Sequence, residues 1–219
     1  MGIEVNLLDS YKKTNRDYDK RAAEKTAEDV RMAKQFGEAF FDGPRSQGYG
    51  GYKYDGRWKS VVARMKEHFN LADDAAILDV GAAKGFMLHD FKEMMPNATI
   101  AGCDVSTYAI DHSLESVKPC LKVASGEELP YADNSFDLVV SINSIHNLPP
   151  ERLKRALQEI ERVSRKHSYI TIDAWRNEQE KENLYKWVLT AETMMHVDDW
   201  VNLFAEVGYT GDYFWFIAD

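Results

Sequence analysis

The chain has few cysteines, no long apolar run and little positive charge, and each of these absences excludes a class of protein. Only Cys103 and Cys120 occur in 219 residues, which excludes a disulfide scaffold and is typical of reduced thiols in a cytoplasmic protein. No apolar run approaches the roughly 18 residues of a membrane span. Met1–Asn15 is polar and lacks the apolar core of a secretory signal. We therefore expect a cytoplasmic protein without a membrane partner.

The net charge of −9 argues against a large nucleic-acid footprint, because an acidic surface repels phosphate. We therefore expect no nucleic-acid partner. No pair of histidines has a ligand-like spacing with acidic residues, so no metal is predicted. A composition of 44% hydrophobic residues over 219 positions is typical of one globular unit with a sizeable core.

Short apolar runs alternate with helical patterns through the middle of the chain. This alternation predicts an α/β fold, a doubly wound Rossmann-like parallel sheet with helices on both faces. Residues 1–58 are expected to form an N-terminal helical extension and a lid, and residues 59–219 the cofactor-binding domain. The expected strands are 76–80, 98–103, 120–124, 136–142, 168–174 and 209–217, and the expected helices are 85–95, 107–117, 150–165, 178–190 and 196–206.

A turn rich in small residues follows the first expected strand. Gly81, Ala83 and Gly85 come directly after the apolar run Ile77–Val80, and small residues let a backbone approach a ligand closely. Asp104 ends the next apolar run, one βαβ unit later, where an acid can accept hydrogen bonds from both hydroxyls of a ribose. The pattern predicts capture of a cofactor that contains adenosine.

The details of the turn favour a cationic cofactor over a dinucleotide. A pyrophosphate site normally has the spacing G-x-G-x-x-G, whereas the small residues here run Gly81-x-Ala83-x-Gly85. Asp79, at the end of the strand, would repel a pyrophosphate but attract an ammonium or sulfonium group.

The segment Asp79–Gly85, Asp-Val-Gly-Ala-Ala-Lys-Gly, resembles the first motif of class I S-adenosylmethionine-dependent methyltransferases. Asp104 matches that family's ribose-binding acid. Residues 125–131, Ser-Gly-Glu-Glu-Leu-Pro-Tyr, are similar to its adenine loop, and residues 134–141 resemble its fourth strand. These four segments lie in the family's order and spacing over about residues 75–175.

The resemblance implies S-adenosylmethionine as cofactor and S-adenosylhomocysteine as product. It also implies a seven-stranded, mostly parallel sheet in the order 3-2-1-4-5-7-6, with strand seven antiparallel. Ala83 and Ser125 depart from the family's usual glycine and aspartate, and we expect rearranged polar contacts there. The residues expected to bind the cofactor are Asp79, Gly81, Ala83, Gly85, Asp104, Val105, Ser125, Gly126, Glu127 and Asn143.

His146 follows the expected fourth strand and is the predicted catalytic residue. Its ordinary pKa of about 6.5 suits a general base near neutral pH. The alternative is a structural histidine that holds the loop together, and the sequence leaves both open.

The stretch 43–58 is rich in glycine, tyrosine and arginine, which a plain linker does not need. We interpret it as a lid over donor and acceptor, the alternative being a loop pinned to the domain by its rings. The expected lid and substrate contacts are Tyr49, Tyr52, Tyr54, Arg57 and Trp58.

The sequence therefore predicts an S-adenosylmethionine-dependent methyltransferase for a small polar substrate, with anionic and carbohydrate-like metabolites as the expected classes. A nicotinamide-dependent oxidoreductase is disfavoured by the turn spacing and by the absence of Tyr-x-x-x-Lys after the fourth strand. A non-catalytic S-adenosylmethionine-binding protein is the other alternative. Neither the acceptor atom nor an oligomeric state follows from the pattern.

Overall fold

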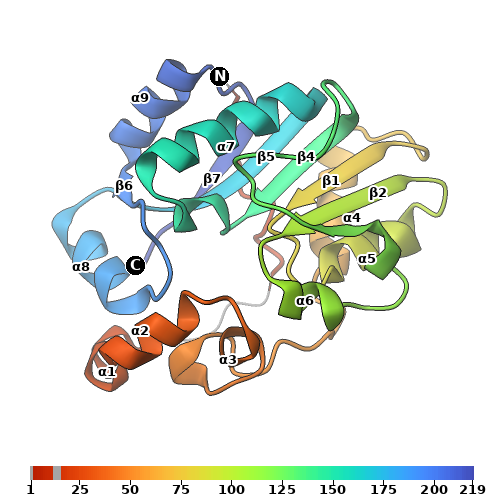
Figure 1. The fold of residues 1–219 in the computed structure, drawn as a ribbon. Helices are drawn as coiled ribbons and strands as arrows, with labels where there is room; N and C mark the ends of the chain where they lie inside the picture. The colour runs from red at the N-terminus through yellow and green to blue at the C-terminus, as the bar shows by residue number, and fades with distance from the viewer. Residues whose placement is uncertain (1, 12–15) are drawn as a thin grey trace.

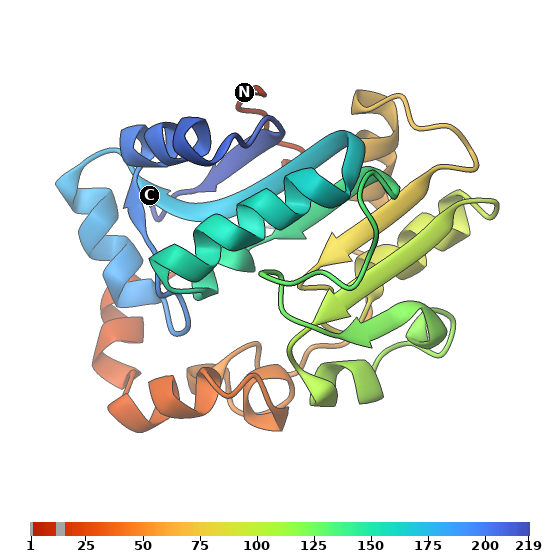
Figure 2. The same ribbon diagram turned by 45° about the horizontal axis from the view of Figure 1, so that its top comes forward.

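A single twisted sheet crosses the molecule, and helices pack on both of its faces (Figures 1 and 2). The structure is a computed structural model that describes residues 2–11 and 16–219. Within these ranges the strands are β1 (Ala76–Val80), β2 (Thr99–Asp104), β3 (Leu121–Val123), β4 (Phe136–Ile142), β5 (Ser164–Trp175), β6 (Met195–His196) and β7 (Asp212–Phe216). The helices there are α1 (Tyr18–Glu24), α2 (Ala27–Ala33), α3 (Glu38–Phe41), α4 (Lys59–His68), α5 (Phe86–Met94), α6 (Thr107–Asp111), α7 (Pro150–Val163), α8 (Glu178–Trp187) and α9 (Val197–Val207).

The sheet has the order β3-β2-β1-β4-β5-β6, and β7 also pairs with β5. This confirms the predicted seven-stranded, doubly wound α/β fold. The chain runs outward from β1 to β3 and then crosses back to β4, so the strand order reverses between β1 and β4. Ligands in such sheets bind at this reversal, beyond the carboxyl ends of the strands.

The expected antiparallel seventh strand is wrong for the described residues. β7 pairs with β5 in parallel, with Tyr169 opposite Asp212 and Asp173 opposite Phe216. The position beyond β7 is taken instead by the N-terminal segment, because Val5 N–H donates to the carbonyl of Tyr213 at 2.9 Å. Edge strands need such protection, since their free backbone groups can pair with another chain.

Side chains that alternate along the central strands build two apolar layers, one on each face of the sheet. In β4, Leu138 and Val140 belong to the layer under α4 and α5, whereas Val139 belongs to the layer under α7 and α9. A strand buried on both faces reads as a continuous apolar run, which explains why β4 was predictable from the sequence. On α7 the buried residues follow helical spacing: Leu153, Ala156, Leu157, Ile160 and Val163.

Three short helices, α1 to α3, lie across the carboxyl ends of the strands together with α8 (Figure 1). They are separate because Thr26 caps the start of α2 in a capping box with Asp29, and Gly37 precedes α3. Lys25, between α1 and α2, holds this layer to α8 by donating to the carbonyls of Tyr185, Lys186 and Val188. The expected domain boundary falls just before α4 and stays a prediction. No helix in the described ranges is long and apolar enough to cross a membrane.

Candidate active site

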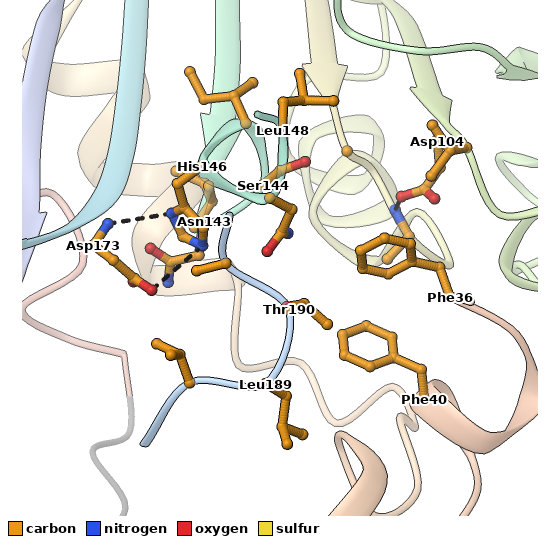
Figure 3. Close-up of a pocket in the computed structure, with 18 of the residues that line it drawn as sticks. Phe36, Phe40, Asp104, Asn143, Ser144, His146, Leu148, Asp173, Leu189 and Thr190 are labelled. Atoms are coloured by element: carbon orange, nitrogen blue, oxygen red, sulfur yellow. Dashed lines mark hydrogen bonds and ion pairs between the residues drawn. The ribbon is translucent and has the colours of Figure 1, made fainter. Parts of the chain in front are cut away.

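A cavity of about 470 Å³ lies at the carboxyl ends of β1, β2, β4 and β5, where the strand order reverses. Its floor comes from the loops that follow these strands. Its roof comes from α1, the segment between α2 and residue 49, and the loop after α8. This volume lies within the range of small-molecule sites. Figure 3 shows side chains of the floor and the roof turned toward the same space.

The glycine turn after β1 forms one wall of the cavity. Gly81 and Ala83 line it, and both have positive φ angles, 85° and 49°. A Cβ atom on Gly81 would lie 1.9 Å from Oγ of Ser144, and one on Gly85 would lie 2.7 Å from Val117. Both glycines are therefore required by packing as well as by conformation. Ala83 accepts a strained backbone where the family motif has glycine.

Asp104, at the end of β2, secures this turn and also faces the cavity. Its Oδ2 accepts a hydrogen bond from Ala83 N–H, and its Oδ1 accepts one from Ser106 N–H, both at 2.8 Å. Burial raises the pKa of this carboxyl group, although the backbone donors work against that rise. Each carboxylate oxygen keeps a second lone pair, so Asp104 can still accept from a ligand. Val105 lines the cavity beside it.

Asp79 lies behind the glycine turn and is not part of the cavity wall. Its side chain is buried, and burial together with the charge of Asp104 raises its pKa to about 8. At neutral pH the Asp79 carboxyl group is therefore mainly protonated in this arrangement, and it makes no direct contact with the cavity.

The loop after β3 supplies another wall. Ser125 and Gly126 line the cavity, whereas Glu127 turns away and pairs with Arg152, whose Nε lies 2.7 Å from the Glu127 carboxylate. The Arg152 hydrogen bond lowers the pKa of Glu127. The two small residues therefore border the space, and the ion pair holds the loop.

His146 and Asp173 meet at the ends of β4 and β5 (Figure 3). Nδ1 of His146 accepts a hydrogen bond from Asp173 N–H at 3.2 Å, and its Nε2 lies 3.6 Å from Asp173 Oδ2. Burial lowers the pKa of His146, while the Asp173 charge raises it. Burial also raises the pKa of Asp173. The sequence analysis missed Asp173, although its place near the carboxyl end of a strand beside β4 was a usable signal.

Two asparagines after β4 also line the cavity. Asn143 is held in place because its Oδ1 accepts from the hydroxyl of Thr171 at 2.9 Å. Oδ1 of Asn147 is buried and has no hydrogen-bond partner. An unpaired buried acceptor is costly, so this atom is suited to a donor group of a ligand.

Of the five residues expected in the lid, Tyr49 alone lines this cavity. Tyr52 stacks on Phe86, with ring centroids 4.7 Å apart, and the hydroxyl of Tyr54 donates to Asp90 at 2.6 Å. Both of these tyrosines are thus attached to α5, outside the cavity.

Arg57 and Trp58 lie farther from the cavity, beside the N-terminal segment. Arg57 Nη2 lies 2.6 Å from Asp55 Oδ2, and Trp58 is buried with its ring 4.8 Å from that of Tyr11. Their contacts hold the start of α4, so the second half of the 43–58 stretch is packed against the domain.

The roof holds cavity residues that the sequence analysis did not select. Phe36 and Phe40 form a T-shaped pair, with centroids 5.3 Å apart. In Figure 3 they face Leu189 and Thr190 from the loop after α8. The spacing of the two phenylalanines, one helical turn apart, was the available signal. Among the described residues no group of three or more His, Cys, Asp or Glu side chains is arranged to hold a metal ion.

Comparison with known proteins agrees with this geometry. The family model described as a methyltransferase domain matches residues 78–172, which include the end of β1, the glycine turn, Asp104 and His146. Residues 78–172, a little under half of the chain, therefore match the methyltransferase-domain family. S-adenosylmethionine is the cofactor of this family, and the matched segment contains most of the cavity floor.

The chain is 31% identical over 147 residues to a tRNA (carboxymethyluridine(34)-5-O)-methyltransferase of Arabidopsis thaliana, covering 66% of this chain and 34% of that protein. It is 34% identical over 115 residues to the mitochondrial arginine-hydroxylase NDUFAF5 of Mus musculus, covering 51% and 32%. The chain thus spans about a third of the length of these relatives. The YcgJ protein of Bacillus subtilis shares the fold, with a TM-score of 0.51, 17% identity and coverage of 67% of this chain and 66% of that one.

Proposed function

We propose that this methyltransferase-family protein transfers the methyl group of S-adenosylmethionine to a small polar acceptor that binds beneath the roof. The observation that carries the proposal is the pairing of Asp104 with the glycine turn at the wall of one cavity, within the matched domain. A relative named as an arginine-hydroxylase is 34% identical over 115 residues, so the reaction is argued from the site and not from the fold.

The cofactor contacts follow from the walls of the cavity. Asp104 accepts hydrogen bonds from the ribose hydroxyls, Ser125 and Gly126 border the adenine, and the backbone of Gly81 approaches the amino-acid part. The free Oδ1 of Asn147 takes an N–H donor. A bound cation would favour the charged form of Asp79, the buried acid behind the turn, and so would lower its raised pKa.

When bound, S-adenosylmethionine supplies an electrophilic methyl group, and loss of that group breaks the carbon–sulfur bond and leaves S-adenosylhomocysteine. The protein aligns the acceptor with this group and excludes water, and the roof serves both tasks. For an acceptor that carries a proton, neutral His146 takes the proton after its ring turns from Asp173 N–H. The Asp173 carboxylate then stabilises the imidazolium, since it already lies 3.6 Å from Nε2.

A small acceptor is favoured over a macromolecule by two observations. The roof covers the sheet ends and leaves a cavity of about 470 Å³, and the net charge is −9. An RNA substrate such as that in the name of the Arabidopsis relative would meet a repulsive surface. A cytoplasmic location fits the two free thiols, Cys103 and Cys120.

Calorimetry with S-adenosylmethionine and S-adenosylhomocysteine tests this proposal. Asp104→Ala should weaken the binding of both by about 1–3 kcal/mol, because it removes a charged acceptor from two hydroxyls. Asp111→Ala, at an exposed position of the following helix, is the control and should bind normally. Binding of NAD in place of S-adenosylmethionine, or an unchanged affinity in Asp104→Ala, would contradict the proposed site.

A further inference from the structure

Three arginines gather around one tryptophan in the roof of the cavity. The guanidinium carbons of Arg16, Arg21 and Arg45 lie 5.4, 5.7 and 5.4 Å from the ring centroid of Trp187. Arg16 also lies 4.5 Å from the ring centroid of Phe216. The sequence brings these residues from both ends of the chain, so the cluster exists only in the folded protein.

The cluster faces the cavity, because Arg21, Arg45, Trp187 and Phe216 all line it. Trp187 ends α8, which packs against α1 and β5, whereas Asp104 ends β2 on the far side of the reversal. Three strand spacings separate β2 from β5, which is about 14 Å. His146 follows β4, between the two ends. Arg21 and Arg45 therefore border the cavity together with Trp187 and Phe216, and Arg16 lies beside these two rings.

The arginine side chains have unused hydrogen-bonding capacity. Nε of Arg16 and Nε of Arg21 are buried and have no hydrogen-bond partner. Within residues 2–11 and 16–219, no carboxylate oxygen lies within 4.0 Å of a side-chain nitrogen of Arg16, Arg21 or Arg45. A buried donor without a partner is costly, and so are like charges held together.

The charges around the cluster do not neutralise it. Burial lowers the pKa of Arg21, and repulsion from Arg45 lowers it further, while Asp29 attracts it. The Asp29 carboxylate is already held by Thr26 and Ser46 through hydrogen bonds at 2.7 and 3.1 Å. Glu24 also attracts Arg21, and Asp173, which is buried against His146, interacts with the charge of Arg16. A ligand that carries its own negative charge would satisfy the free donors.

We propose that Arg21 and Arg45, with the charge of Arg16 beside them on Trp187, form a subsite for an anionic group, a carboxylate or a phosphate, of the methyl acceptor. This inference rests on the proposed function, since it names the substrate class of the same site. Arginine suits the task because its planar fork binds carboxylate or phosphate through two parallel hydrogen bonds. Trp187 contacts the guanidinium groups by cation–π interaction. Nη1 of Arg21 and Nη1 of Arg45 donate to the carbonyls of Arg45 and Gly48, and their remaining N–H groups can donate to a ligand. The anionic group lies at the roof, and the atom that receives the methyl group lies toward His146.

The test uses the full chain saturated with S-adenosylhomocysteine. Calorimetry then measures binding of three probes of similar size: glucose 1-phosphate, glucuronate and uncharged glucose. The subsite predicts that at least one charged probe binds and that glucose does not, and the stronger of the two charged probes identifies phosphate or carboxylate. Arg21→Gln and Arg45→Gln should each weaken that probe by about tenfold or more, with S-adenosylhomocysteine affinity within about twofold of wild type.

The control is Arg31→Gln, which removes a charge from an exposed arginine of α2 that pairs with Glu28. It should bind the probe as wild type does. Arg21→Lys keeps the positive charge but loses the planar, two-pronged guanidinium, so its probe affinity should lie between those of Arg21→Gln and the wild type. This partial affinity would show that the loss in Arg21→Gln does not come from misfolding.

Three outcomes overturn the subsite. Neither charged probe binds, or the glutamine variants bind it normally, or the variants lose affinity for S-adenosylhomocysteine and not for the probe. The last result would assign the arginines to the carboxylate of the cofactor and would leave the proposed function standing. Failure of the wild-type chain to bind S-adenosylhomocysteine would instead contradict the proposed function itself.

Discussion

Two opposing effects act on the pKa of the His146 imidazole. Burial disfavours its charged form and lowers its pKa, whereas the Asp173 charge favours that form. Since burial is the larger influence, the neutral ring predominates at neutral pH, which is the form a general base needs. The same burial raises the pKa of Asp173, so the two groups titrate as a coupled pair.

An NMR titration of the histidine rings tests this balance. The His146 resonance, assigned from its loss in His146→Asn, should titrate with a midpoint below 6.5. Asp173→Asn removes the attraction that raises the pKa, so the midpoint should move to still lower pH. In turnover, His146→Asn should cost about 100-fold for an acceptor that must lose a proton.

Asp198→Asn is the matched control for that titration, because Asp198 is exposed and lies beside His196 instead. It should leave the His146 midpoint unchanged. A midpoint above 6.5, or one that does not respond to Asp173→Asn, would show that the pair does not set the state of the ring.

At the scale of elements, the roof depends on the contact between α1 and α8. Lys25 Nζ donates to three carbonyls at the end of α8, those of Tyr185, Lys186 and Val188, at 2.8, 3.1 and 3.0 Å. A cation at a helix C-terminus satisfies free carbonyls and complements the helix dipole. Lys25 is therefore one of the side chains that connect the N-terminal layer to the segment after β5, together with the ion pair between Asp19 and Lys186.

Lys25→Met should weaken this junction by about 1–3 kcal/mol, because it removes hydrogen bonds from a charged donor. The expected result is faster amide hydrogen exchange in α1 and α8, with the exchange of β1 and β4 unchanged. Lys20→Met, at an exposed position of α1, should leave exchange as it is in the wild type. Uniform acceleration over the whole chain would mean that Lys25 supports the fold and not the roof alone.

The 43–58 stretch divides into two parts with different contacts. Tyr49 faces the cavity, whereas Tyr54 is hydrogen-bonded to Asp90 on α5. On binding of S-adenosylhomocysteine together with an acceptor, amide exchange should slow in residues 45–49 and stay unchanged in residues 52–58. Slowing across both parts would support the whole stretch as a lid, and no slowing in either would make it packing.

The sequence predicted those elements whose signal is local. β1 and β4 carry apolar runs because both of their faces are buried, and the start of α5 follows from the turn that contains Gly85. β5 begins at Ser164, before the predicted start at 168. The prediction missed these residues because Arg165, which pairs with Asp137, breaks the apolar pattern. Polar residues that are satisfied by a distant partner look like a loop in sequence.

The cavity floor was predictable for the same reason, and most of the roof was not, although Tyr49 was expected in the lid and lines the cavity. Gly81, Asp104 and His146 each follow a strand in a recognisable place. The contact of His146 with Asp173 and the cluster around Trp187 join residues far apart in the chain, and no spacing in the sequence encodes such contacts. The match of shape and charge across a cavity appears only when the chain is folded.

At the scale of the whole molecule, Asp79 makes stability depend on pH. Its pKa is raised to about 8 in the folded state, against about 3.9 in an unfolded chain. Between these values the folded state binds more protons than the unfolded state, so stability falls as pH rises from about 4 to 8. The slope is at most about 1.4 kcal/mol for each pH unit.

Asp79→Asn removes this group and should be more stable than wild type at pH 8, with the difference shrinking toward pH 4. Denaturant unfolding without cofactor measures it, since a bound cation would offset the buried charge. Asp74→Asn, at an exposed position before β1, is the control and should follow the wild type. A difference that grows as pH falls would contradict the raised pKa.

The backbone pairing of residues 3–5 with β7 affects the tendency of two molecules to associate through their sheet edges. Residues 3–5 do not line the cavity. They cover the edge that β7 would otherwise expose. A strand edge with free N–H and C=O groups invites pairing with a second chain. Trimming the N-terminus would thus create a surface that favours aggregation, and a preparation that keeps these first residues is the one suited to concentrated samples.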